Sequence, residues 1–188
     1  MKIVIITASP NASGLTATCG ESAMQGAKLE GAEVTLVSLN EKNIGRCQCC
    51  NNGFGTCRDS HGCQVADDFP AIHNVLKAAD GYIIVTPVYW GEMSETAKTF
   101  IDRLRRCEAY KTNNEPNQLE GKPMVCVAAA GGTGNGCISC LASMERFVDH
   151  VKGIKFDFIG VTRRNREYKL EAIRDAAKGL VRSIRDKY

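Results

Sequence analysis

Residues 81–106 read GYIIVTPVYWGEMSETAKTFIDRLRR and contain a predicted strand, a loop and a helix. Four apolar residues, Tyr82–Val85, stand between a glycine and Pro87, which is typical of a strand covered on both faces. After Ser94, a predicted N-cap, apolar residues recur at helical spacing at Ala97, Phe100, Ile101, Leu104 and Cys107. Open α/β sheets bind ligands beyond the carboxyl ends of their strands. The aromatic pair Tyr89 and Trp90 lies at such an end and suits stacking on a flat heterocycle.

The rest of the chain repeats this alternation of strand and helix. Further strands are predicted at Ile3–Thr7, Val34–Leu39, Met124–Ala129 and about Lys155–Val161. Five such units without an internal repeat predict an α/β fold, a doubly wound five-stranded parallel sheet with helices on both faces and strand order 2-1-3-4-5. We expect one domain over residues 1–188, with a cysteine-rich loop, residues 45–66, inserted after the second strand. Asp68 is expected to cap the helix that follows, and a polar loop is expected around Lys111–Glu120.

Composition narrows the class of protein. The chain has 188 residues, 44% of them hydrophobic, and a net charge of +3, which is too small to suggest a nucleic-acid partner. No segment approaches the roughly 20 apolar residues that span a bilayer, and the N-terminus shows no secretion signal. We therefore expect a cytoplasmic protein with no membrane partner.

The loop TASPNASGLT, residues 7–16, leaves the first strand and opens the first helix. Free backbone N–H groups and the helix dipole favour an anion there, and glycine lets the backbone come close. The loop has no lysine of the P-loop type, so it suits a flavin phosphate better than a triphosphate. An ordinary capped helix start is the alternative. A second glycine-rich loop, AAAGGTGNG at residues 128–136, follows the fourth strand and can also approach a ligand closely.

Together these motifs resemble the NADPH-dependent FMN reductases of the flavodoxin-like fold, and especially their iron–sulfur flavoprotein branch. The resemblance rests on the motifs SPNASGLT, TPVYWGEMSETAKTFIDRL and GGTGNG. The resemblance implies that FMN is bound without a covalent bond. Its phosphate would be held by Ser9, Asn11, Ser13, Gly14, Leu15 and Thr16. Its ring would be flanked by Pro87, Val88, Tyr89, Trp90 and Gly91, with Gly131, Gly132 and Thr133 on the other side. The resemblance also implies a homodimer or homotetramer with the flavin near a subunit interface.

Five of the ten cysteines crowd into CQCCNNGFGTCRDSHGC, residues 47–63. In a cytosolic protein such a loop favours metal binding or redox chemistry over disulfides. The resemblance implies a [4Fe–4S] cluster, but glycine occupies the usual third cysteine position. Four thiolates can still be drawn from Cys47, Cys50, Cys57 and Cys63. Zinc, held by these four or by three of them with His61, and a loop of free thiols are the alternatives. Because the second strand ends at the ligand edge of the sheet, we expect this loop near the flavin.

These expectations define two functions. In the first, NAD(P)H reduces FMN, which then reduces a quinone, azo, nitro or similar acceptor, or a redox protein through the cluster. In the second, the protein is a non-catalytic electron carrier between redox proteins. Arg163, Arg164 and Arg166 follow the last strand. They form a phosphate contact for NADPH, a contact to a flavin phosphate across a subunit interface, or a solvated basic loop. Cys137 and Cys140 form a C-x2-C pair at a helix start, which we interpret as packing residues.

Overall fold

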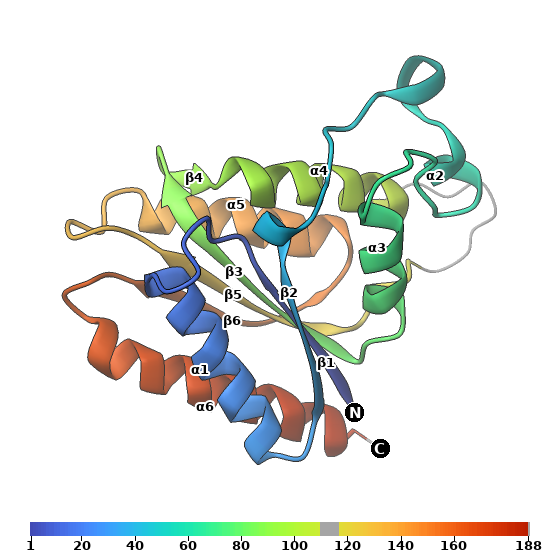
Figure 1. Ribbon diagram of the computed structural model, residues 1–188. Coiled ribbons are helices and arrows are strands. Elements are labelled where there is room, and N and C mark those ends of the chain that lie inside the picture. The colour runs from blue at the N-terminus through green and yellow to red at the C-terminus, as the bar shows by residue number, and fades with distance from the viewer. Residues whose placement is uncertain (110–116, 188) are drawn as a thin grey trace.

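The computed structural model describes residues 1–109 and 117–187 and contains one parallel sheet between two layers of helices (Figure 1). Its strands run in the order β2-β1-β3-β5-β6, which confirms the predicted order 2-1-3-4-5. The numbering differs because a two-residue strand, β4, pairs antiparallel with the end of β3. The strands are β1 (Lys2–Thr7), β2 (Glu33–Ser38), β3 (Gly81–Tyr89), β4 (Glu92–Met93), β5 (Pro123–Ala129) and β6 (Ile154–Val161).

The helices cover both faces of the sheet, as predicted. One face carries α1 (Leu15–Leu29) and α6 (Arg166–Arg185), and the other carries α3 (Phe69–Lys77), α4 (Glu95–Ala109) and α5 (Cys137–His150). Alternate strand residues face the two layers, because successive side chains of a strand point to opposite faces. Ile3 and Ile5 pack toward α1 and α6, whereas Val4 and Ile6 pack toward the other three helices. Burial on both faces explains why the strands are apolar throughout.

Helix α4 follows the predicted pattern closely. Its apolar positions from Ala97 to Cys107 are buried, Lys98 is exposed, and Asp102 and Arg105 are partly exposed. The hydroxyl of Ser94 accepts a hydrogen bond from the N–H of Ala97 at 3.3 Å, so the predicted N-cap is confirmed.

Strand β3 is longer than predicted. It continues through Pro87 to Tyr89 and then reverses tightly into β4. Trp90 and Gly91 form the turn with φ angles of +51° and +78°. Positive φ at both central residues is the geometry that two-residue hairpins prefer, because its twist matches that of the paired strands. Pro87 does not end the strand, since β5 still pairs beside it at Ala129.

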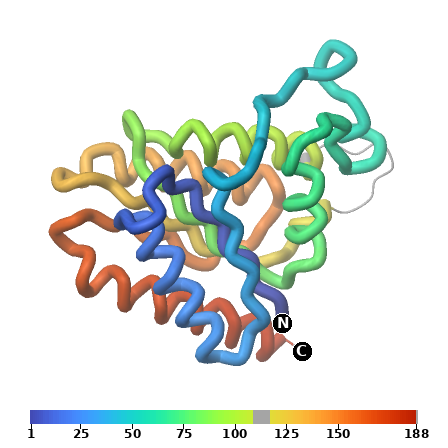
Figure 2. The backbone as a smooth tube through the Cα atoms, viewed as in Figure 1, coloured from blue at the N-terminus to red at the C-terminus, as the bar shows by residue number. Residues whose placement is uncertain are grey.

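The cysteine-rich loop expected at residues 45–66 extends beyond the sheet, close to α3 and the last turns of α4 (Figures 1 and 2). It contains two short helices, η2 (Cys50–Gly53) and α2 (Thr56–Asp59), and follows a third, η1 (Leu39–Glu41). Asp68 is the N-cap residue of α3, as predicted, but its side chain makes no cap bond. Asp67 Oδ1 instead accepts the N–H of Phe69 at 3.0 Å.

A buried, hydrogen-bonded pair of side chains links α3 and α4. His73 Nε2 lies 2.6 Å from Glu108 Oε1, and both side chains are at most 1% exposed. The other carboxylate oxygen of Glu108 accepts the N–H groups of Gln118 and Leu119 at 2.7 and 3.2 Å. Glu108 therefore holds the backbone of Gln118 and Leu119, just before β5, against α4. The polar loop expected around Lys111–Glu120 lies outside the described residues as far as residue 116.

Within residues 1–109 and 117–187, none of the helices has the length and apolar character needed to cross a membrane.

Candidate functional site

The loop after β1 is shaped by its own polar side chains. Ser9 Oγ donates a hydrogen bond to the carbonyl of Asn11 at 2.7 Å, and Asn11 Oδ1 accepts the N–H of Ser13 at 3.0 Å. Helix α1 then begins after Gly14, which offers no side-chain cap. The first-turn N–H groups of a helix have no partners within it. The loop thus presents them, with the positive end of the helix dipole, at the carboxyl edge of the sheet.

The buried residues Thr86 and Ser94 join this loop to β3 and to the start of α4. The backbone N–H of Ala8 donates to Val85 at 3.1 Å, and Ser94 Oγ lies 3.4 Å from the carbonyl of Ala8. The N–H of Ser94 donates to Thr86 Oγ1 at 3.1 Å. Thr86 and Ser94 are 0% and 1% exposed. Sequence reasoning recognised Ser94 only as a cap and missed its second role, which is to hold two loops of the site together.

The turn at Trp90 and Gly91 packs directly on the start of α5. A Cβ atom on Gly136 would lie 2.4 Å from the Cα of Gly91, so the two glycine backbones are in contact. Ser139 Oγ donates a hydrogen bond to the carbonyl of Gly91 at 2.8 Å. Neither Gly136 nor Ser139 was among the predicted site residues. The only sequence signal was the glycine run itself, because the contact depends on how the hairpin folds.

The turn at Trp90 and Gly91 and the start of α5 border an open hollow of about 810 Å³, a size typical of small-molecule sites. Its wall consists of Val88, Tyr89, Trp90, Gly91, Asn135, Gly136 and Ser139. The structure thus brings together four of the five predicted ring-flanking residues of β3 and its turn, while Pro87 is buried behind them. Gly131, Gly132 and Thr133 are exposed in the loop between β5 and α5 and do not line this hollow.

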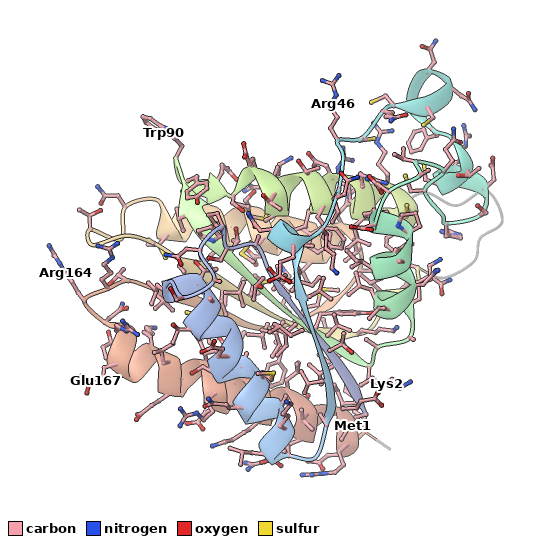
Figure 3. The ribbon with its side chains drawn as sticks, in the orientation of Figure 1. Met1, Lys2, Arg46, Trp90, Arg164 and Glu167 are labelled. Atoms are coloured by element: carbon pink, nitrogen blue, oxygen red, sulfur yellow. The ribbon has the colours of Figure 1, made fainter. Side chains whose placement is uncertain are left out.

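The two aromatic side chains are open to solvent. Tyr89 is 46% exposed and Trp90 is fully exposed, and Trp90 points away from the body of the protein in Figure 3. Its φ of +51° is uncommon for a bulky residue and is held by the hairpin and its contact with α5. A large aromatic ring displayed in this way is available to stack on a ligand or a partner.

The four cysteines predicted to bind a metal line one small cavity. They are Cys47, Cys50, Cys57 and Cys63, and Arg103 and Arg106 of α4 line it with them. All these thiols are free. In the part of the chain that the structure describes, no group of three or more His, Cys, Asp or Glu is close enough to hold a metal ion. The cysteines therefore share a cavity without converging at ligating distances.

The donor set nevertheless fits a thiolate-bound group. Four sulfur donors match the ligand number of an iron–sulfur cluster and of structural zinc. Both arginines carry a buried Nε that has no hydrogen-bond partner among the described residues. Unsatisfied donors of this kind are rare and costly, although Arg174 of α6, which does not line the cavity, carries a third. His61 is buried and donates from Nδ1 to the carbonyl of Cys107 at 2.8 Å.

The cysteine loop is not beside the hollow, contrary to the expectation from the sheet edge. Ser94 lies just before α4 and bonds the loop after β1 at the carboxyl edge of the sheet, whereas Arg103 lies at the cysteine cavity, about 14 Å farther along the helix at 1.5 Å per residue. In Figure 3, Trp90 and Arg46, which precedes the first cysteine, lie apart on the molecule. The reason is that the chain after β2 crosses to the α4 side of the sheet and packs on the end of that helix.

The pair Cys137 and Cys140 is buried under the hollow. Cys137 Sγ lies 3.3 Å from the carbonyl of Ala128, and Cys140 is 0% exposed. Burial raises the pKa of Cys140 to about 12 and also raises the pKa of Cys137. Both remain thiols at neutral pH, which favours the interpretation as packing residues over a redox pair.

Comparison with known proteins agrees with this arrangement. The sequence model of the NADPH-dependent FMN reductase family matches residues 1–157. An iron–sulfur flavoprotein of Methanocaldococcus jannaschii is 34% identical over 105 residues, which are 56% of this chain and 52% of the relative. A second from that organism is 33% identical over 147 residues, or 78% of this chain and 70% of the relative. The chain thus matches about half the length of the first relative and more of the second.

Solved structures share the fold. A flavone reductase superposes with a TM-score of 0.78 at 17% identity, covering 100% of this chain and 64% of that one. The NAD(P)H:quinone oxidoreductase of Methanothermobacter marburgensis superposes with a TM-score of 0.72 at 17% identity, covering 96% of both chains. Sheet order, sequence match and curated relatives agree: the chain belongs to the NADPH-dependent FMN reductase family, in its iron–sulfur flavoprotein branch.

Proposed function

We propose that this protein is an FMN-dependent oxidoreductase that accepts a hydride from NAD(P)H. The observation that carries the proposal is the joining of three loops at the carboxyl edge of the sheet. Ser94 ties the loop after β1 to β3, and Ser139 ties the turn after β3 to α5. A mononucleotide lying across the first and third strands of this fold meets all three loops. Family membership and the flavin-enzyme neighbours support the same conclusion.

In this proposal the phosphate of FMN lies at the start of α1. The hydroxyls of Ser9 and Ser13 turn from Asn11 to the phosphate and, with the hydroxyl of Thr16 and backbone N–H groups, supply neutral donors. Asn11 Oδ1 keeps the shape of the loop by accepting the N–H of Ser13. Gly14 leaves room for the phosphate because it carries no side chain. Leu15 begins the helix that provides the dipole.

The isoalloxazine ring lies at the end of β3, against Pro87–Gly91, with Gly131–Thr133 on the opposite side. When bound, FMN supplies the hydride chemistry, and the chain's task is to hold the ring and leave one face accessible. The hollow is open to solvent, and Tyr89 is half-exposed on its wall. This opening gives NAD(P)H and then a quinone, azo or nitro compound a place to stack in turn.

The cysteine cavity is proposed to bind a [4Fe–4S] cluster through Cys47, Cys50, Cys57 and Cys63. The names of the curated relatives and the unpartnered arginine donors support a thiolate-bound group. A [4Fe–4S] cluster transfers single electrons, which suits a redox-protein acceptor. Zinc in the same four-thiolate site is the alternative, and it would give the loop a structural role only.

A non-catalytic electron carrier is the second candidate function. The full exposure of Trp90, and of Ile138 (84% exposed) at the start of α5, favours contact with a protein surface. The same patch suits a second copy of this chain, in line with the proposed homodimer or homotetramer.

Assays of NAD(P)H oxidation and of reduction by a ferredoxin-type protein separate the enzyme from the electron carrier. Protein reconstituted with FMN should oxidise NADPH or NADH in the presence of a quinone acceptor if it is an enzyme. Reduction only by a ferredoxin-type protein, with no NAD(P)H oxidation, would support the carrier and reject the enzyme. Iron, sulfide and zinc content of anaerobically purified protein identifies the group in the cysteine cavity.

A further inference from the structure

Arg103 is the largest of the fully buried side chains among the described residues. It is 1% exposed and lines the cysteine cavity. A buried charge is costly unless it is paired and hydrogen-bonded. The partners of Arg103 therefore show which parts of the molecule its burial holds in place.

Its guanidinium closes the base of the cysteine loop. Nη1 donates to Asp67 Oδ2 and, at 3.0 Å, to the carbonyl of Gly45, while Nη2 donates to Asp67 Oδ1 at 3.0 Å. The N–H of Gly45 also donates to Asp67, at 2.9 Å. The ring of Phe69 lies 4.3 Å below the guanidinium carbon. One side chain of α4 thus holds both ends of the loop.

The same guanidinium also reaches one of the four cysteines. Nη2 of Arg103 donates to Cys63 Sγ at 3.2 Å, while its Nε has no partner among the described residues. Arg106, one turn later, holds the other side of the loop by donating to the carbonyl of Gly53 and lying 4.7 Å from the ring of Phe54. Arg103 is therefore joined to a predicted ligand directly. Arg106 Nη2 lies 4.0 Å from the sulfur of Cys49, which is not one of the four predicted ligands.

We propose that Arg103 is the positioning residue of the cysteine site, orienting Cys63 as a ligand and donating an N–H···S hydrogen bond to its sulfur. The inference rests on the proposed thiolate site. Groups that hydrogen-bond to metal ligands fix their orientation, and losing one typically costs about 10–100-fold in metal affinity. Hydrogen bonds to the sulfurs also set the potential of a cluster. Lysine cannot replace the forked donor, because it can keep the ion pair with Asp67 but lacks the second arm toward Cys63.

Cobalt(II) titration of the full-length, metal-free, reduced protein tests the proposal. Thiolate-bound cobalt absorbs strongly, and a competing chelator makes its affinity measurable. Arg103→Lys should bind cobalt about 10–100-fold more weakly than the wild type and shift the sulfur-to-cobalt band. Arg105→Lys is the matched control, since that side chain is 43% exposed on the same helix, and it should bind as the wild type does.

Two further readouts separate positioning from a general loss of structure. The FMN affinity of Arg103→Lys should stay close to the wild-type value, whereas its melting temperature should fall, because lysine cannot also bond Gly45 and stack on Phe69. Equal cobalt affinity in Arg103→Lys and the wild type would overturn the proposal, as would losses of cobalt affinity and FMN affinity that move together. A wild-type protein that takes up no cobalt would also overturn it, while FMN binding by the same sample would leave the proposed oxidoreductase function standing.

Discussion

Replacing Gly136 by alanine should displace the turn that carries Tyr89 and Trp90. The new Cβ would lie 2.4 Å from the Cα and 2.9 Å from the N of Gly91. Because both atoms belong to the backbone, the clash is relieved only by moving the turn away from α5. The left-handed conformation at residue 136, φ +78°, costs alanine about 1–2 kcal/mol, and the overpacking adds about 1–3 kcal/mol. The expected loss of unfolding free energy is about 2–5 kcal/mol.

Gly31 provides the matched control. Its φ is +79°, nearly the same, but nothing lies within 4 Å of a Cβ built there. Gly31→Ala should therefore show only the conformational cost of about 1–2 kcal/mol. The difference between the two variants isolates the contact of Gly136 with Gly91.

Urea unfolding and an FMN titration, followed by the quenching of flavin fluorescence, measure the two effects. Gly136→Ala should be less stable than Gly31→Ala and should bind FMN about tenfold or more weakly, since 1.4 kcal/mol corresponds to a factor of ten. Gly31→Ala should bind FMN with wild-type affinity. Equal stability and equal FMN affinity in the two variants would refute the claim that this contact holds the ring site together.

Three further perturbations follow from the structure. Glu108→Ala removes one partner of a buried pair and two backbone contacts, so urea unfolding should show a loss of about 3–5 kcal/mol. Burial works to raise the pKa of Asp67, but the hydrogen bonds from Arg103 and two backbone N–H groups outweigh it and hold that pKa below its ordinary 3.8. The ionised Asp67 therefore stabilises the folded protein fully above about pH 3.8, and this stabilisation is lost as the pH falls through the lowered pKa. Pepsin cleavage within residues 45–67 should therefore rise below pH 3.8, and an unchanged cleavage rate would contradict this. Arg163→Ala combined with Arg164→Ala should raise the KM for NADPH more than that for NADH, and equal KM values would assign these residues to a solvated loop.

Much of the fold was predictable because it depends on local periodicity. The apolar run of Ile3–Thr7, buried on both faces of the sheet, and the helical stripe from Ala97 to Cys107 are properties of neighbouring residues, and both agree with the structure. The strand order followed from the alternation of strands with helices, which confines the topology to a few choices. The ends of elements were less certain, and β3 continued past Pro87 because its neighbour β5 extends equally far.

The missed features all depend on contacts between distant parts of the chain. Arg103 resembles any charged residue on an amphipathic helix, and only the return of Asp67, 36 positions earlier, makes its burial possible. Gly136 belongs to a glycine run in which sequence alone does not distinguish the glycine that contacts the hairpin from its neighbours. The position of the cysteine loop could not be predicted either, because no periodic pattern indicates where an irregular segment packs.

Trp90 is the single tryptophan of the chain and is fully exposed on the wall of the hollow, so its emission reports directly on the proposed ring site. FMN should be titrated into the flavin-free protein while tryptophan emission and retained flavin are both measured. We expect saturable quenching that ends at one FMN per chain. Protein that retains no FMN, with unchanged Trp90 emission at every FMN concentration, would contradict the proposal that the three loops form a flavin site.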